Sequence, residues 1–221
     1  MYLNYIYPYL IFISSSILMS VFISDFNILD DGLRHLYFAK NNITNGYEGS
    51  LYFGSLLSTE SSLWFSFEYV LNLFFSVGFN QNEIVVIINT FSLFMLMSAL
   101  YIGFNRTYND NFKAMFLTII AIWFLNHGFL MKYTNLRPDF ISGLFVMFTL
   151  LYIKNNKAIL VLSILYSLTY YVFWFYIGLF VLLFVFMREF NKIKFLLPSL
   201  IVGSIFNYYF IGTDFFTSII Y

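Results

Sequence analysis

The chain has 221 residues, of which 61% are hydrophobic, 24% aromatic and only 10% charged. Soluble domains average about 25% charged residues, so this composition excludes a soluble globular protein and a disordered chain. Eleven basic residues balance eleven acidic ones, which leaves no net charge to attract nucleic acid. With no cysteine and two histidines, the chain cannot form a disulfide framework, a thiolate metal site or a histidine-rich metal site. We therefore predict an integral membrane protein of the all-α class.

Charge-free segments mark the predicted spans, because a spanning helix needs about 20 apolar residues. Most of these segments fit one helix, but Ala158–Met187 is long enough for two short spans with a turn near Tyr170 and Tyr171. The sequence thus predicts a polytopic transmembrane helical bundle of about seven spans, in a single transmembrane domain over residues 1–221. The other predicted spans lie in Met1–Ser24, Ile84–Asn105, Ala114–Met131, Phe140–Ile153 and Phe195–Thr213.

One more apolar segment, Leu63–Phe79, contains Glu68, and a carboxylate in the middle of a bilayer costs about 2.5 kcal/mol or more. If this segment does not span and the N-terminus is cytoplasmic, most basic residues fall inside, as the positive-inside rule requires. If it does span and Ala158–Met187 is one helix, the rule is reversed. We therefore predict a juxtamembrane helix at the outer interface with Glu68 toward water. The basic residues placed inside are Arg106, Lys113, Lys154, Lys157, Arg188, Lys192 and Lys194.

The large first external loop, Asp25–Gln81, holds a second predicted helix, over Asp31–Ala39, that begins at an acidic pair. One interpretation is structural: Asp30 or Asp31 caps this helix, and Arg34 is a charge partner one turn later. The other is functional, because a carboxylate can remove the proton of an acceptor hydroxyl as a general base.

A second polar cluster, Lys132–Asp139, lies on the same predicted external face. Its structural interpretation is a helix start, with Pro138 in the first turn and Asp139 complementing the helix dipole, while Arg137 reaches the headgroups. Its functional interpretation is that Lys132 and Arg137 bind the phosphate of a leaving group. Because both clusters lie at span ends on one side of the membrane, together they predict a site open to a lipid-borne donor.

The order of these features resembles the GT-C superfamily of polytopic glycosyltransferases, such as protein O-mannosyltransferases and aminoarabinose transferases, which use polyprenyl-phosphate-linked sugar donors. The sequence Asp30-Asp31-Gly32-Leu33-Arg34-His35 stands where the acidic motif of that family stands. The sequence Asn135-Leu136-Arg137-Pro138-Asp139 resembles the family element that opens the fourth span.

The resemblance implies that Asp30 or Asp31 is the general base, with Asp30 preferred, or that the pair helps to hold a divalent metal in members that use one. It implies a sugar transfer to a glycan, lipid or protein acceptor on the extracytoplasmic face. The expected location is the inner (plasma) membrane of a bacterium, with the N-terminus cytoplasmic and membrane lipids around the chain. The residues expected to bind substrate are Arg34, His35, Lys132, Arg137 and Asp139.

Two alternatives stay open. Two polar elements of the family are replaced here, by Ser61-Ser62 and by Tyr170, and enzymes of the family continue with a further C-terminal part. The chain is therefore expected to lack that part, and it could be a non-catalytic subunit or fragment that works with a partner subunit. A small transporter is less favoured, because transporters place ionisable residues near the membrane midplane and the charges here lie at span ends.

Overall fold

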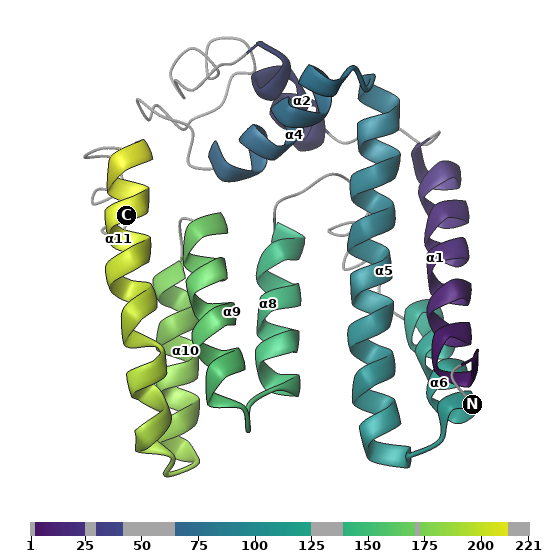
Figure 1. Ribbon diagram of the computed structural model, residues 1–221. Coiled ribbons are helices and arrows are strands. Elements are labelled where there is room, and N and C mark those ends of the chain that lie inside the picture. Colours follow the sequence, from purple (N-terminus) through teal and green to yellow (C-terminus); the bar gives the residue numbers. More distant parts are fainter. Residues whose placement is uncertain (1–2, 25–29, 42–64, 125–138, 171–172, 212–221) are drawn as a thin grey trace. The chain divides into compact units, whose positions relative to one another are not determined.

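The computed structural model describes residues 3–24, 30–41, 65–124, 139–170 and 173–211, and these are helical apart from short turns. No strand occurs in these ranges, which confirms the all-α class. Figure 1 shows the elements, which are α1 (Leu3–Ser24), α2 (Asp30–Asn41), α4 (Phe65–Val77), α5 (Gln81–Tyr108), α6 (Asn111–Phe124), α8 (Asp139–Leu151), α9 (Asn156–Thr169), α10 (Phe173–Phe186), the 3₁₀ helix η1 (Phe190–Phe195) and α11 (Leu197–Ile211).

The predicted spans and the two predicted loop helices all contain helix. The segment Ala158–Met187 is divided as predicted, because α9 ends at Thr169 and α10 begins at Phe173. Two helical segments are long and apolar enough to cross a membrane, Gln81–Tyr108 and Phe190–Phe210. The helices α6, α8, α9 and α10 have 13 or 14 residues each. At 1.5 Å per residue each is only about 20 Å long, against a hydrocarbon core of about 30 Å, so a bundle of seven spans stays a prediction.

The chain divides into two compact units. Unit 1 consists of Met1–Leu33 and Gly78–Phe140, and unit 2 consists of Arg34–Val77 and Ile141–Tyr221. Each unit is built from segments that are far apart in the sequence. The single transmembrane domain expected from the sequence therefore stays a prediction, and the two units are described separately.

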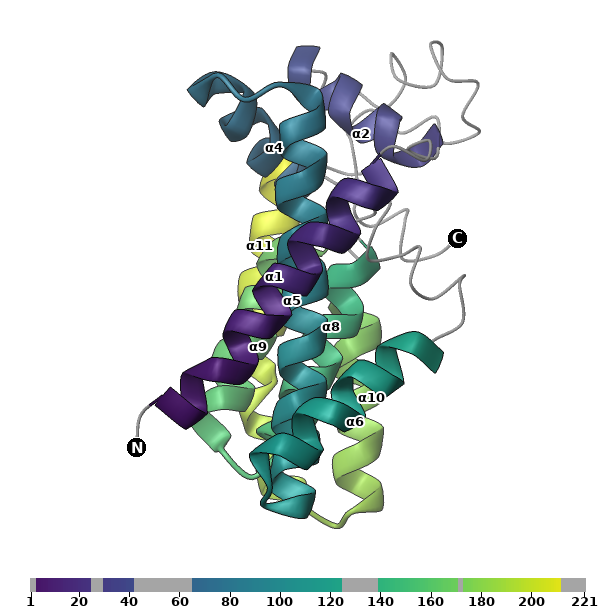
Figure 2. The ribbon, with the colours of Figure 1, turned by 90° about the vertical axis from the view of Figure 1, so that its right-hand side faces the viewer.

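Unit 1 is formed by α1, α5 and α6, and Figure 2 shows α1 running across α5. Their contact is mainly aromatic: the rings of Tyr9 and Phe12 each meet the ring of Tyr101 edge-on, with centroids 5.5 Å apart. Ser16, which is fully buried, donates to the sulfur of Met97 at 3.8 Å. The small polar residue thus lies inside the contact, where it lets the two helices approach closely.

Local sequence explains where α5 begins and ends. Its N-terminus is a capping box, in which the Asn80 side chain accepts from the Glu83 backbone N–H and the Glu83 carboxylate accepts from the Asn80 N–H. It ends at Asn109, whose φ of 50° is left-handed, a conformation that asparagine tolerates better than most residues. Asp110 then accepts from two backbone N–H groups at the start of α6. The sharp turn between α5 and α6 is therefore encoded locally.

Unit 2 has an aromatic core between α8, α9 and α10. Tyr166 and Tyr176 lie with ring centroids 4.5 Å apart, and Phe180 continues the stack from Tyr176 at 4.7 Å. The hydroxyl groups of both buried tyrosines are satisfied by α8: Tyr166 donates to Ser142 at 2.9 Å, and Tyr176 shares a 2.5 Å hydrogen bond with Thr149. Burying a tyrosine is favourable when its hydroxyl finds such a partner.

The contact between α9 and α11 is made by small and polar residues. A Cβ atom on Gly203 would lie 2.6 Å from the Cβ of Ser167 and 2.9 Å from the ring of Phe173, so only glycine fits there. One turn later, Asn207 donates to the backbone oxygens of Ser167 at 3.0 Å and Gly203 at 2.8 Å. The missing side chain of Gly203 therefore sets how closely α11 approaches α9.

Candidate functional site

The most distinctive polar contact of unit 2 joins α2 to α4. His35 Nδ1 and Glu68 Oε1 are 2.9 Å apart, and their side chains are only 1% and 6% exposed. The ring of Phe67 meets the imidazole edge-on, with centroids 5.5 Å apart and planes at 89°. A buried carboxylate is costly unless it is paired and hydrogen-bonded, so each residue of this pair makes the burial of the other tolerable.

This pair corrects one prediction. The sequence placed Glu68 toward water on a juxtamembrane helix, but Glu68 is 5% exposed and faces α2. The apolar side chains of Tyr69, Val70 and Leu73 on α4 are exposed instead. The prediction was wrong because His35, 33 residues earlier in the chain, supplies the polar partner that water would otherwise supply. Leu63–Phe79 does contain a helix, α4, as predicted.

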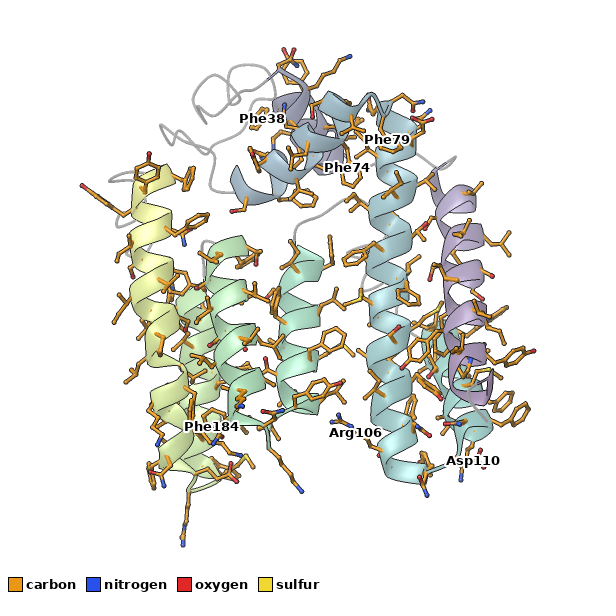
Figure 3. The ribbon with its side chains drawn as sticks, in the orientation of Figure 1. Phe38, Phe74, Phe79, Arg106, Asp110 and Phe184 are labelled. Carbon is orange, nitrogen blue, oxygen red and sulfur yellow. The ribbon has the colours of Figure 1, made fainter. Side chains whose placement is uncertain are left out.

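A second hydrogen bond holds the same two helices together. The Asn72 amide donates to the backbone oxygen of Ala39 at 2.7 Å. Asn72 lies four residues after Glu68, and Ala39 lies four residues after His35, so both contacts follow one face of each helix. Leu36 of α2 and Leu71 of α4 are buried, the ring of Phe67 packs against His35, and Figure 3 shows Phe38 of α2 and Phe74 of α4 in this region. The α2–α4 contact thus combines two polar ties with apolar packing.

The start of α4 is fixed to the end of α9. The hydroxyl group of Ser66 donates at 2.8 Å to the backbone oxygen of Leu168, one of the last carbonyls of α9, which have no partner within their own helix. Figure 1 shows α4 running across that end of α9 rather than along it. The α2–α4 pair is therefore held at the C-terminal end of α9.

The imidazole of His35 has a defined chemical orientation. When the Glu68 carboxylate is ionised it only accepts hydrogen bonds, and the Nδ1 atom of His35 is then the donor. The Nε2 atom, the second ring nitrogen, is buried as well. A carboxylate that orients a histidine in this way is a recurring arrangement for proton transfer. The buried pair can therefore hold a proton at Nε2, or it can serve only to join two helices.

The structure places some of the predicted site residues. Asp30 and Asp31 form the first turn of α2, but their side chains lie outside the described part of the structure. Arg34 is half-buried and His35 fully buried on the same helix. Asp139 begins α8, as the helix-start interpretation predicted, and its side chain is likewise not described. Lys132 and Arg137 lie outside the described residues, so whether the two polar clusters meet stays a prediction.

Sequence reasoning recognised His35 but missed Glu68 as its partner. No pattern along the chain joins the two, because they lie 33 residues apart on different helices. Among the side chains that the structure describes, no three His, Asp or Glu residues form a group that could hold a metal ion. A divalent metal at the acidic pair therefore stays open as a prediction.

A comparison of the chain with known proteins finds no matching family model, no matching curated protein and no matching solved structure.

Proposed function

We propose that the chain is an integral membrane glycosyltransferase that transfers a sugar from a polyprenyl-phosphate donor to an acceptor hydroxyl on the extracytoplasmic face of the inner (plasma) membrane. The observation that carries this proposal is the α2–α4 contact. It gives a helix that begins with two adjacent carboxylates a fixed support, through the His35–Glu68 pair and the Asn72–Ala39 hydrogen bond.

The membrane location is supported by the polarity of α11. Ile201, Ile205 and Tyr209 form one stripe at four-residue spacing and are 64%, 66% and 80% exposed. Ser199, Gly203 and Asn207 follow the same spacing on the face that packs against α9, where Ser199 and Asn207 are buried. A helix in water buries its apolar stripe, whereas small polar residues at the contact and apolar residues outside are typical of helices in lipid.

The proposed reaction uses the acidic pair as a base. The carboxylate of Asp30 takes the proton of the acceptor hydroxyl while the oxygen of that hydroxyl attacks the anomeric carbon of the donor sugar. The bond between the anomeric carbon and the phosphate oxygen breaks, and the polyprenyl phosphate leaves with the electron pair. A basic side chain, for which Arg137 and Lys132 are the candidates, neutralises the charge that develops on the phosphate.

The decisive variant is Asp30→Asn, which keeps the size and the helix-capping ability of the residue but removes its basicity. We expect the rate of sugar transfer from a polyprenyl-phosphate donor to fall about 10²–10⁴-fold. The matched control is Asp110→Asn at the start of α6, where asparagine can replace aspartate as a cap. Wild-type transfer by the Asp30→Asn protein would remove Asp30 from the mechanism, and release of the chain by alkaline carbonate would remove the membrane location.

The buried His35–Glu68 pair also favours a second candidate, a proton-coupled transporter. Paired His and Glu side chains away from water are typical of proton pathways in membrane proteins. Liposomes with the purified chain separate the two candidates: a transporter moves protons with its solute across a sealed membrane without any donor lipid, and Glu68→Gln stops that movement. A glycosyltransferase shows no such flux.

A further inference from the structure

Five basic residues of unit 2 gather at one end of the helices α8 to α11. Between Asp139 and Asp214 the sequence contains a single carboxylate, Glu189, and five basic residues. Two of the basic residues lie at the turn between α8 and α9, and three lie in the connection between α10 and α11. They are Lys154, Lys157, Arg188, Lys192 and Lys194.

Lys192 joins these two connections. Its Nζ atom donates to the backbone oxygen of Ile153 at 2.8 Å, and it forms an ion pair with Glu189. Its side chain is only 14% exposed. The carboxylate of this region is therefore engaged by a largely buried lysine, while the four other basic residues, Lys154, Lys157, Arg188 and Lys194, are exposed. We call these four residues the basic surface.

One member of the basic surface, Lys157, lies where its own helix gains nothing from the positive charge. Lys157 is in the first turn of α9, whose cap is supplied by Asn155, and a positive charge at a helix N-terminus opposes the helix dipole. Arg188 lies two residues after the end of α10 with a φ of 59°, and its positive charge there complements the helix dipole. The position of Lys157 is therefore better explained by an external partner than by the stability of its own helix.

The surroundings of the basic surface indicate the chemistry of that partner. Apolar side chains next to it in the chain are strongly exposed: Phe186 is 88% exposed, Phe190 60% and Leu197 50%. Figure 3 shows Phe184 near this end of unit 2, where several side chains tipped with nitrogen extend outward. Basic groups beside exposed apolar side chains match the boundary of a membrane, where anionic headgroups border the acyl chains.

We propose that the basic surface binds the anionic headgroups of phospholipids in the adjoining leaflet. The proposal rests on the membrane location inferred above but not on the sugar-transfer reaction. The five basic residues and Glu189 together carry an excess of four positive charges. Helix α9 separates this end of unit 2 from the α2–α4 contact. Headgroups bound here would anchor one end of α9 while its other end supports the candidate site.

The test uses the purified chain of 221 residues in a neutral detergent. It is titrated with dioleoyl phosphatidylglycerol, dioleoyl phosphatidylcholine or inorganic phosphate, and the melting temperature and the lipids retained in native mass spectrometry are measured. We expect only phosphatidylglycerol to raise the melting temperature and to be retained. Its effect should weaken between about 0.1 M and about 1 M salt, because exposed charges are screened.

Two matched triple variants test the residues. Lys154→Gln, Lys157→Gln and Lys194→Gln together should weaken phosphatidylglycerol binding, by about fivefold for each charge removed. Replacing the same three lysines with arginine keeps the charge and should keep the binding, and circular dichroism checks that both proteins are folded. Equal binding of phosphatidylcholine, an equal effect of inorganic phosphate, or full binding by the glutamine variant would each overturn the proposal. If the purified chain binds phosphatidylglycerol but transfers no sugar, only the proposed sugar-transfer reaction is contradicted.

Discussion

The α2–α4 and α9–α11 contacts of unit 2 show two different ways to bury polar groups between helices. The first uses ionisable side chains, His35 and Glu68, whereas the second uses glycine, serine and asparagine. Small neutral residues cost little to bury and permit close packing. The His35–Glu68 pair is charged only when the imidazole is protonated, and a buried charged pair is often no more stabilising than apolar residues of similar size. The comparison therefore separates a contact that depends on one specific polar pair from a contact that depends on close packing.

The largest expected effect comes from breaking the His35–Glu68 pair. Glu68→Ala leaves His35 buried without the carboxylate and should lower the free energy of unfolding by about 3–5 kcal/mol. Replacing both residues with leucine should cost less than the single change, because no uncompensated charge remains. Detergent-titration unfolding measures both, with Glu68→Gln as the control that keeps a hydrogen-bonding group. A double variant less stable than Glu68→Ala would show that the pair is a net source of stability.

An intermediate effect is expected at the α9–α11 contact. Gly203→Ala places a Cβ atom 2.6 Å from the Cβ of Ser167, and neither backbone can yield without moving its helix. We expect the free energy of unfolding to fall by about 1–3 kcal/mol, as for other overpacked cores. The proposed sugar transfer should be unaffected in the folded fraction. An unchanged unfolding midpoint would mean that α11 is free to shift away from α9.

The smallest effect is expected at Gly178, a glycine of α10. A Cβ atom added at Gly178 of α10 meets no atom within 4 Å, and the residue is exposed. Gly178→Ala should therefore leave the stability unchanged or raise it by up to about 1 kcal/mol, since alanine loses less backbone freedom in a helix. The same unfolding assay measures it. Destabilisation at Gly178 comparable to that at Gly203 would show that the close approach of α9 is not the cause of the effect at Gly203.

Much of the secondary structure could be predicted from hydrophobic patterns and charge gaps. The break between α9 and α10 near Tyr170 followed from length alone, because a charge-free segment of 30 residues is too long for one ordinary span. The helix predicted over Asp31–Ala39, which the structure extends to Asp30–Asn41, followed from apolar spacing and its acidic start. These features are local, so they depend only on residues within one or two turns.

The candidate site was predicted only in part. His35 was recognised because it lies next to the acidic pair, but Glu68 was assigned to the solvent, since a lone carboxylate in an apolar helix is costly to bury. The cost disappears only when a specific partner is present, and no pattern along the chain identifies a partner 33 residues away. The role of the pair in holding α2 was therefore beyond sequence reasoning.

The sequence by itself determined that this protein is helical, apolar and poor in charge, because composition and periodicity act locally and are written in the order of residues. Tertiary structure alone decided which polar groups meet. It brought His35 to Glu68, Ser66 to the end of α9, and Gly203 against Ser167. The physical reason is that the free energy of burying a polar group depends on its partner, and the partner is chosen by the packing of helices rather than by neighbours in the chain.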